Sequence, residues 1–224
     1  MEAIKFNDLN HQKIKEREVI KRILSGEKEL YELLIRRNNQ KLYRAIRSYF
    51  KEEVEIEDIM QNSYIKAYIK LYQFKLESSF STWLIRIGIN EALARLKEKS
   101  KLRHLNEPSV SFKDNTTLEI PDKRHLNPQE SMIRKEAIQL LENAIDQLDL
   151  KYRTVYILKE VEEMPLKEIA LVLELTIANV KIRLHRSKEM LKVKLYELSN
   201  DQNIFEFGFN RCDRVTKNVM NSIH

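Results

Sequence analysis

Residues 168–191, EIALVLELTIANVKIRLHRSKEML, contain the pattern that decides the fold. The apolar spacing predicts a short helix over 166–173 and a longer helix over 177–198, separated by a three-residue turn. Thr176 directly precedes the longer helix, and its hydroxyl can cap the unpaired N–H groups of the first turn. The stretch therefore predicts two consecutive helices joined by a tight turn.

Three side chains suit close packing of these two helices. Ala170 is small enough to let them approach, while Val180 and Leu184 lie four residues apart on one face of the second helix. A short helix, a tight turn and a longer helix are typical of a helix-turn-helix, in which the second helix lies in the DNA major groove. A plain helical hairpin with a solvated face is the alternative interpretation.

The charge of the chain is concentrated in two stretches. The chain has 40 Lys and Arg against 34 Asp and Glu, a net charge of +6. Residues 177–195 contain six basic residues and one acidic residue, and residues 83–104 contain six basic and two acidic ones, which leaves the rest of the chain net acidic. Either stretch alone could be a solvated helix face. Two basic faces on one otherwise acidic chain favour a polyanionic partner, and nucleic acid above all.

The composition excludes several classes of protein. Three glycines cannot form a Gly-rich phosphate loop, which excludes Rossmann and P-loop nucleotide enzymes. Cys212 is the only cysteine, and the five histidines are not spaced as a metal pair on one helix face, so no metal and no cofactor are expected. No charge-free run approaches the roughly 18 residues of a membrane span. A soluble, cytoplasmic protein is expected.

The remaining sequence is also helical in pattern. Helical apolar spacing predicts four further helices within residues 1–104, the fourth of them capped by Ser79 or Ser81. The spacing collapses over 105–129, which contains three prolines and is predicted to be a linker, and returns over 130–198. Residues 199–224 form a tail whose apolar spacing suits an amphipathic helix. We expect an all-α fold of two small helical domains joined by a flexible linker, with a single domain as the alternative.

Two further motifs, together with the helix-turn-helix stretch, resemble those of a known protein family. Residues 56–68, IEDIMQNSYIKAY, and 80–90, FSTWLIRIGIN, resemble region 2 of bacterial sigma factors of the extracytoplasmic-function (ECF) group. The helix-turn-helix stretch 168–191 resembles region 4 of the same family. The resemblance implies a dissociable, non-catalytic subunit with which RNA polymerase finds and opens promoters. The implied partners are core RNA polymerase, through its largest-subunit coiled coil and its flap, promoter DNA and an anti-sigma factor.

The resemblance also implies roles for individual residues. Core polymerase would be bound by Asp58, Gln61 and Asn62. The minus-ten promoter element would be bound by Lys66, Phe74, Arg86, Ile87, Asn90, Arg95 and Lys97, with a single flipped base among Lys66, Phe74, Ile87 and Asn90. The minus-thirty-five element would be bound by Lys181, Ile182, Arg183, His185, Arg186 and Lys188. An aromatic ring can stack on a splayed base and an amide can read its edge, but Phe74 is also suited to an ordinary core position.

The sequence departs from the family pattern in the turn. Glu174 stands where the family usually has glycine, so the turn has to form without a residue that is free to adopt a positive φ. Ile182 stands where a small polar residue is common, which bears on base preference. A repressor or activator that does not join polymerase would use the same second domain and is the alternative function, whereas the acidic run 52–58 has no partner for enzyme chemistry.

Overall fold

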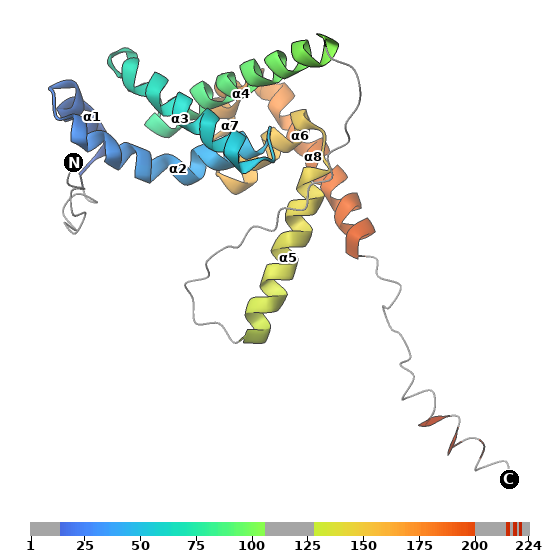
Figure 1. Cartoon of the computed structure of the whole chain (residues 1–224). Helices are drawn as coiled ribbons and strands as arrows, with labels where there is room; N and C mark the ends of the chain where they lie inside the picture. The colour runs from blue at the N-terminus through green and yellow to red at the C-terminus, as the bar shows by residue number, and fades with distance from the viewer. Residues whose placement is uncertain (1–13, 106–127, 200–213, 216, 219, 221–224) are drawn as a thin grey trace. The chain divides into compact units, whose positions relative to one another are not determined.

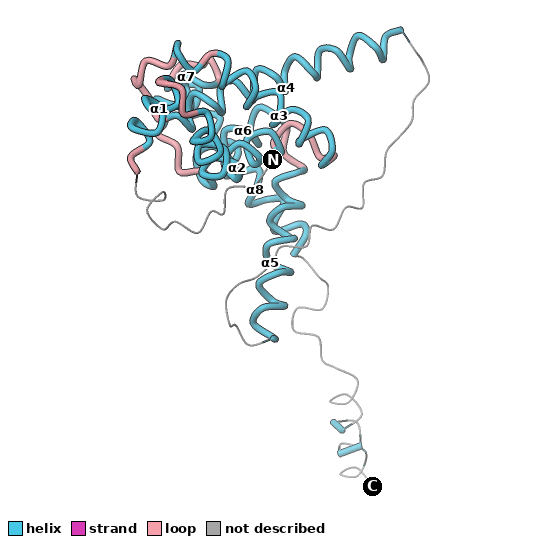
Figure 2. The backbone as a smooth tube through the Cα atoms, turned by 60° about the vertical axis from the view of Figure 1, so that its left-hand side comes forward, coloured by secondary structure: helices cyan, strands magenta, loops and turns pink. Residues whose placement is uncertain are grey.

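The computed structural model describes residues 14–105 and 128–199, and residues 214, 215, 217, 218 and 220 of the tail. All regular structure in these residues is helical, as the cyan tube in Figure 2 shows, which confirms the all-α class. The helices are α1 (Glu16–Leu24), α2 (Tyr31–Arg47), α3 (Glu53–Ile69), α4 (Phe80–Leu105), α5 (Pro128–Asp146), α6 (Leu150–Tyr156), α7 (Leu166–Val172) and α8 (Ile177–Ser199). Single turns η2 (Lys28–Leu30) and η3 (Leu71–Gln73) are 3₁₀-helical, and η4 (Ile157–Val161) is a π-helical turn.

The contacts divide the chain into two compact units. The larger unit comprises Met1–His125 and Leu148–Lys188, and the smaller one comprises Leu126–Gln147 and Glu189–His224. In the larger unit α6, η4, α7 and the first half of α8 pack with α1–α4. Compactness alone therefore does not test the domain boundaries predicted from the sequence, and those boundaries remain a prediction.

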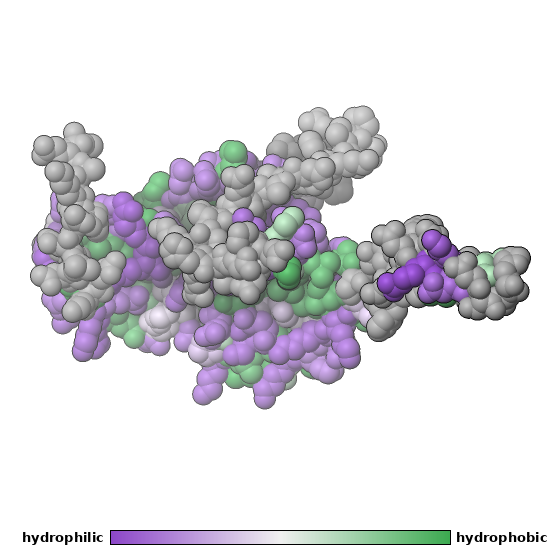
Figure 3. Space-filling model, turned by 90° about the horizontal axis from the view of Figure 1, so that it is seen from below, coloured by the Kyte–Doolittle hydropathy of each residue, from purple (hydrophilic) through white to green (hydrophobic). Residues whose placement is uncertain are grey.

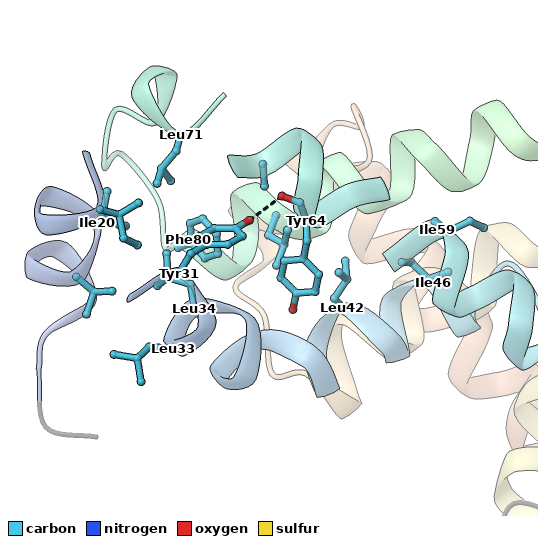
Figure 4. Close-up of a cluster of buried hydrophobic side chains, with 14 of the residues drawn as sticks. Ile20, Tyr31, Leu33, Leu34, Leu42, Ile46, Ile59, Tyr64, Leu71 and Phe80 are labelled. Atoms are coloured by element: carbon cyan, nitrogen blue, oxygen red, sulfur yellow. Dashed lines mark hydrogen bonds between the residues drawn. The ribbon is translucent and has the colours of Figure 1, made fainter. Parts of the chain in front are cut away.

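The core of α1–α4 is formed by large side chains that are almost completely buried. Figure 4 shows this cluster, including Leu34, Leu42, Ile46 and Phe80, with Ile56 and Leu84 equally buried. The hydroxyl of Tyr31 in α2 donates a 2.7 Å hydrogen bond to the carbonyl of Tyr64 in α3. Such a bond satisfies a polar group that would otherwise be costly to bury, and it ties α2 to α3.

A second apolar cluster joins α6, α7 and α8 to α2 and α4. Ala45 of α2 and Ile85 and Ile89 of α4 are buried in this cluster. The side chains that cover them belong to the later helices: Val155, Leu158, Met164, Ile169, Ala170, Val172 and Val180, with Leu184 partly buried beside them. Figure 1 shows α7 lying beside α4. The packing roles predicted for Ala170, Val180 and Leu184 are confirmed.

Two predicted helix caps are present. The Thr176 hydroxyl accepts a 3.1 Å hydrogen bond from the N–H of Asn179 at the start of α8. The Ser79 hydroxyl accepts a 3.1 Å hydrogen bond from the N–H of Thr82 at the start of α4. Each bond satisfies one of the N–H groups that lack a partner within the helix, so each helix begins where its capping residue stands.

The turn between α7 and α8 contains a residue in the left-handed region. Glu174 has φ +54°, and its carboxylate lies 3.2 Å from Nη2 of Arg86 in α4. Leu76, in the loop before α4, and Glu163, before α7, also have positive φ. A side chain with a Cβ adopts this region at a steric cost, so the turn forms in spite of Glu174.

Several predictions fall on residues that are not described. The predicted linker 105–129 lies outside the described residues except at its two ends, which belong to α4 and α5. The predicted amphipathic tail, including Cys212, also lies largely outside them. Among the described residues no helix is long and apolar enough to span a membrane. Figure 3 shows hydrophilic side chains over most of the described surface in that view, with smaller apolar patches between them.

We predict that Glu174→Gly is more stable than Glu174→Ala by about 1 kcal/mol, because only glycine adopts positive φ without steric cost. Both substitutions remove the contact with Arg86, so their difference isolates the backbone term. Equilibrium urea unfolding of the two variants measures it. Equal stability would show that the turn relaxes to negative φ when the side chain is shortened.

Candidate polymerase and nucleic-acid interface

A groove of about 420 Å³ lies between α3 and α4 and brings together the three residues predicted to bind polymerase. Asp58, Gln61 and Asn62 are exposed along one side of α3 and line this groove. The α4 side is lined by Glu91, Ala94, Arg95 and Glu98. The groove is therefore polar and mixed in charge, which suits a partner that offers both charges along a helix.

Ion pairs fix the charged side chains around this groove. Arg95 lies 3.1 Å from Glu98 and 3.4 Å from Glu55, and its hydrogen bonds to these carboxylates raise the pKa of the guanidinium. Lys66 Nζ lies 2.6 Å from both carboxylate oxygens of Glu91. Lys66 and Arg95 were predicted to bind the minus-ten element, and the structure places both beside the α3–α4 groove.

The outer face of α4 presents the other predicted minus-ten residues. Trp83, Ile87 and Asn90 have the i, i+4, i+7 spacing of one helix face, and Asn90 is exposed. The ring of Phe74 lies 5.2 Å from the Trp83 ring at an interplanar angle of 36°, and 6.0 Å from the Phe80 ring. Two helix turns separate Trp83 from Asn90, about 10 Å along the axis. Phe74 and Asn90 therefore lie at opposite ends of one strip.

Asn90 also lines a second cleft, of about 490 Å³. Arg183 of α8 lines the same cleft, together with Tyr49, whose pKa is raised by burial. Next to it Arg86, another predicted minus-ten residue, is paired with Glu174 of the helix-turn-helix turn. The structure thus brings residues predicted for the two promoter elements to one cleft.

The predicted minus-thirty-five residues of α8 differ in their surroundings. Lys181, Ile182 and His185 are exposed, whereas Arg183 is partly buried at the cleft. Arg186 NH1 lies 3.5 Å from the hydroxyl of Tyr152, and Lys188 Nζ lies 2.9 Å from a carboxylate oxygen of Glu160. Lys97, predicted for the minus-ten element, is exposed on α4. Exposed pairs such as Lys188–Glu160 contribute little stability, so their cations remain able to bind phosphate.

Sequence reasoning did not include Asn179, which its position makes a further candidate for a base contact. It is exposed in the first turn of α8, behind the Thr176 cap, and base edges are contacted by the N-terminal residues of a recognition helix. Its position just after the predicted cap indicated in the sequence that it could contact bases. The prediction instead favoured basic residues further along α8, because of their charge. In the part of the chain that the structure describes, no three His, Cys, Asp or Glu side chains gather as a metal site would require.

Two family models match the stretches of chain that carry these candidate residues. Residues 34–102 match the family model of sigma-70 region 2, and residues 138–191 match that of sigma-70 region 4. The first range contains α3 and most of α4, and the second contains α7 and most of α8, the predicted recognition helix. The two regions, in this order on one chain, define a sigma factor of RNA polymerase.

The relatives refine this class. The ECF RNA polymerase sigma factor SigW of Bacillus subtilis (strain 168) is 29% identical over 179 residues, which cover 80% of this chain and 96% of the relative. The ECF RNA polymerase sigma-E factor of Haemophilus influenzae is 27% identical over 191 residues, covering 84% and 98%. The chain therefore belongs to the ECF group of RNA polymerase sigma factors, which direct transcription initiation. The predicted resemblance is confirmed.

Solved structures show the same fold. The sigma factor RpoE from Bartonella quintana, in complex with the anti-sigma factor NepR, has a TM-score of 0.59 at 18% identity and covers 79% of this chain and 98% of that chain. CnrH in complex with the cytosolic domain of CnrY has a TM-score of 0.55 at 22% identity, covering 81% and 97%.

Proposed function

We propose that this sigma factor binds core polymerase through the α3–α4 groove, and the two promoter elements through α4 and α8. The observation that supports this division is the grouping of Asp58, Gln61 and Asn62 on one groove, separate from the face of Trp83 and Asn90. The implied docking partners are the coiled coil of the largest polymerase subunit and the polymerase flap. The chain acts by binding these partners and has no catalytic chemistry of its own. It acts in the cytoplasm, where its partners lie.

For the minus-ten element, the strip from Phe74 to Asn90 suits successive unstacked nucleotides better than a single flipped base. Phe74 and Trp83 offer aromatic faces at one end, and Asn90 offers an amide about 10 Å further along. Ile87 lies between them as an apolar surface. Lys97 lies beyond Asn90 on α4 and would bind a phosphate of the same strand, whereas Arg95 lines the α3–α4 groove.

For the minus-thirty-five element, the exposed face of α8 enters the major groove. Asn179 and Ile182 contact base edges, since they lie in the first two turns of the helix. Phosphates or bases further along the element are bound by the remaining predicted residues of α8: Lys181, Arg183, His185, Arg186 and Lys188. An anti-sigma factor is a further expected partner, because the neighbours RpoE and CnrH were each solved with a second protein, NepR and the cytosolic domain of CnrY.

The test of this function is reconstitution. The purified chain added to core polymerase should start run-off transcription at promoters that core polymerase alone ignores, and it should co-elute with core polymerase. A repressor or activator would bind DNA without core polymerase. A folded protein that fails to bind core polymerase would therefore favour that alternative.

Variants of two exposed asparagines test whether polymerase binding and promoter opening use different surfaces. We expect Asn90→Ala to leave core binding intact and to reduce open complex about three- to tenfold, because one hydrogen bond to an unstacked base is lost. Asn62→Ala is the matched variant in the α3–α4 groove and should weaken core binding instead. Permanganate reactivity of promoter thymines measures opening, and fluorescence anisotropy measures core binding. Loss of core binding in Asn90→Ala would contradict the assignment.

The first turns of α8 allow base contacts to be distinguished from phosphate contacts. Asn179→Ala should change base preference at one position of the minus-thirty-five element, at a cost of about 1 to 3 kcal/mol for the preferred base. Lys181→Ala should weaken all sequences alike and lower the slope of log K against log salt by about one. Binding to a set of single-base promoter variants at several salt concentrations measures both. Uniform weakening by Asn179→Ala would show that it does not read a base.

A further inference from the structure

Helix α1 reaches the start of α4 through one carboxylate. Glu16, in the first turn of α1 and only partly exposed, accepts a 2.9 Å hydrogen bond from the backbone N–H of Phe80. The two residues are 64 positions apart in the sequence. Phe80 is the first residue of α4, so its N–H has no partner within that helix. The carboxylate of Glu16 therefore caps α4 from a different helix.

The charge of Glu16 also suits this position. The first turn of α4 contains no acidic side chain of its own, and the N-terminus of a helix carries a partial positive charge. Ser79 supplies a neutral hydroxyl, which accepts a hydrogen bond from the N–H of Thr82. Glu168 reaches the same turn but bonds to the Thr82 hydroxyl and not to the backbone. Glu16 thus adds a negative charge at the backbone N–H groups of α4.

Helix α1 contacts both elements that flank the loop 74–79. It packs on η3, which ends immediately before Phe74, and it caps α4, which begins directly after the loop. Ile20 of α1 and Phe80 of α4 lie in one buried cluster (Figure 4). Within the loop Leu76 has φ +60°, which a residue with a Cβ keeps only where its surroundings hold it. Helix α1 is therefore placed to fix the course of this loop.

The capped residue belongs to a cluster of three aromatic rings. The Phe80 ring lies 5.8 Å from the Trp83 ring and 6.0 Å from that of Phe74, and the Phe74 and Trp83 rings lie 5.2 Å apart. Phe80 is completely buried, whereas Phe74 and Trp83 are partly exposed. Because packed side chains have little free space, a fixed Phe80 limits the positions open to the other two rings. Those are the rings proposed to face unstacked nucleotides.

We propose that Glu16 is a positioning residue for the minus-ten strand: by capping α4 it fixes the aromatic end of the strip from Phe74 to Asn90. The inference rests on the proposed role of this strip in binding unstacked nucleotides. Asn90 lies about two helix turns beyond Trp83, so its position is independent of Glu16. The match to sigma-70 region 2 begins at residue 34, so α1 lies outside the range on which the family assignment rests.

The fluorescence of Trp83 tests the positioning in the free protein, because Trp83 is the only tryptophan of the chain. Glu16→Ala removes the cap, whereas Glu16→Gln keeps a side-chain oxygen that can accept the hydrogen bond from Phe80. Glu18→Ala is the matched control, since Glu18 is an exposed acid in the same first turn of α1. We expect Glu16→Ala to shift the Trp83 emission to longer wavelength and to increase its quenching by acrylamide, because a loosened ring meets more water. The other two variants should keep the wild-type spectrum.

Binding of a single-stranded minus-ten oligonucleotide by core polymerase carrying this chain tests the consequence. We expect Glu16→Ala to weaken this binding about three- to tenfold, the range of one lost hydrogen bond, and Glu16→Gln to restore most of it. Core binding, measured by fluorescence anisotropy, should stay unchanged, and urea unfolding verifies that each variant is folded. In double-mutant cycles Glu16→Ala should add little to Phe74→Ala but should add in full to Asn90→Ala.

Three results would overturn the inference. The first is full additivity of Glu16→Ala with Phe74→Ala, and the second is an effect of Glu18→Ala equal to that of Glu16→Ala. The third is an unchanged Trp83 spectrum in Glu16→Ala, because the rings would then keep their place without the cap. If Phe74→Ala and Asn90→Ala both leave oligonucleotide binding at its wild-type level, the proposed function of the strip fails, while the Trp83 spectrum still reports whether Glu16 positions the rings.

Discussion

The structure depends on one helix, α4, which has three different faces. Two of them pack against other helices, and the third faces outward. Successive residues are rotated by about 100°, so Phe80, Leu84 and Gly88 point to one side, Ile85 and Ile89 to a second, and Asn90 with Trp83 to a third. The first side packs on α2, where a Cβ on Gly88 would lie 2.6 Å from Leu42 Cδ1. The second packs on residues 148–188, the helix-turn-helix module. The third is the face proposed to bind the strand of a melted promoter.

The three faces of α4 explain what the sequence could and could not reveal about packing. A helix that is apolar on two sides has no simple amphipathic stripe, so its apolar spacing alone does not separate Phe80 and Leu84 from Ile85 and Ile89, which lie in the other cluster. Local features were predictable, because the Thr176 and Ser79 caps and the Val180–Leu184 pair act within a few residues. The docking of the module depends on contacts more than 80 residues apart, which no local pattern encodes.

The candidate site was predictable where its residues lie on one helix, because their spacing in the sequence determines which face they share. Asp58, Gln61 and Asn62 share a face of α3, and the structure finds them on one groove. The predicted single-base site depends on where the loop before α4 places Phe74, whose ring lies 5.2 Å from that of Trp83, two helix turns before Asn90. The family usually has glycine at position 174, and Glu174 adopts the positive φ that a glycine would allow, while its side chain contacts Arg86.

If Arg86 binds the minus-ten element as proposed, DNA and the Glu174 carboxylate compete for its guanidinium. Arg86 is one of the basic residues proposed for the minus-ten element, and in this structure its partner is a carboxylate of the module. An exposed ion pair of this kind contributes little net stability, so exchanging the Glu174 carboxylate for a phosphate costs little. Arg44–Glu162 is different, because the Glu162 carboxylate is buried and remains without a partner if the module shifts only slightly. The buried Arg44–Glu162 pair therefore defines the position of η4 against α2 more strictly than the exposed Arg86–Glu174 pair defines that of the turn.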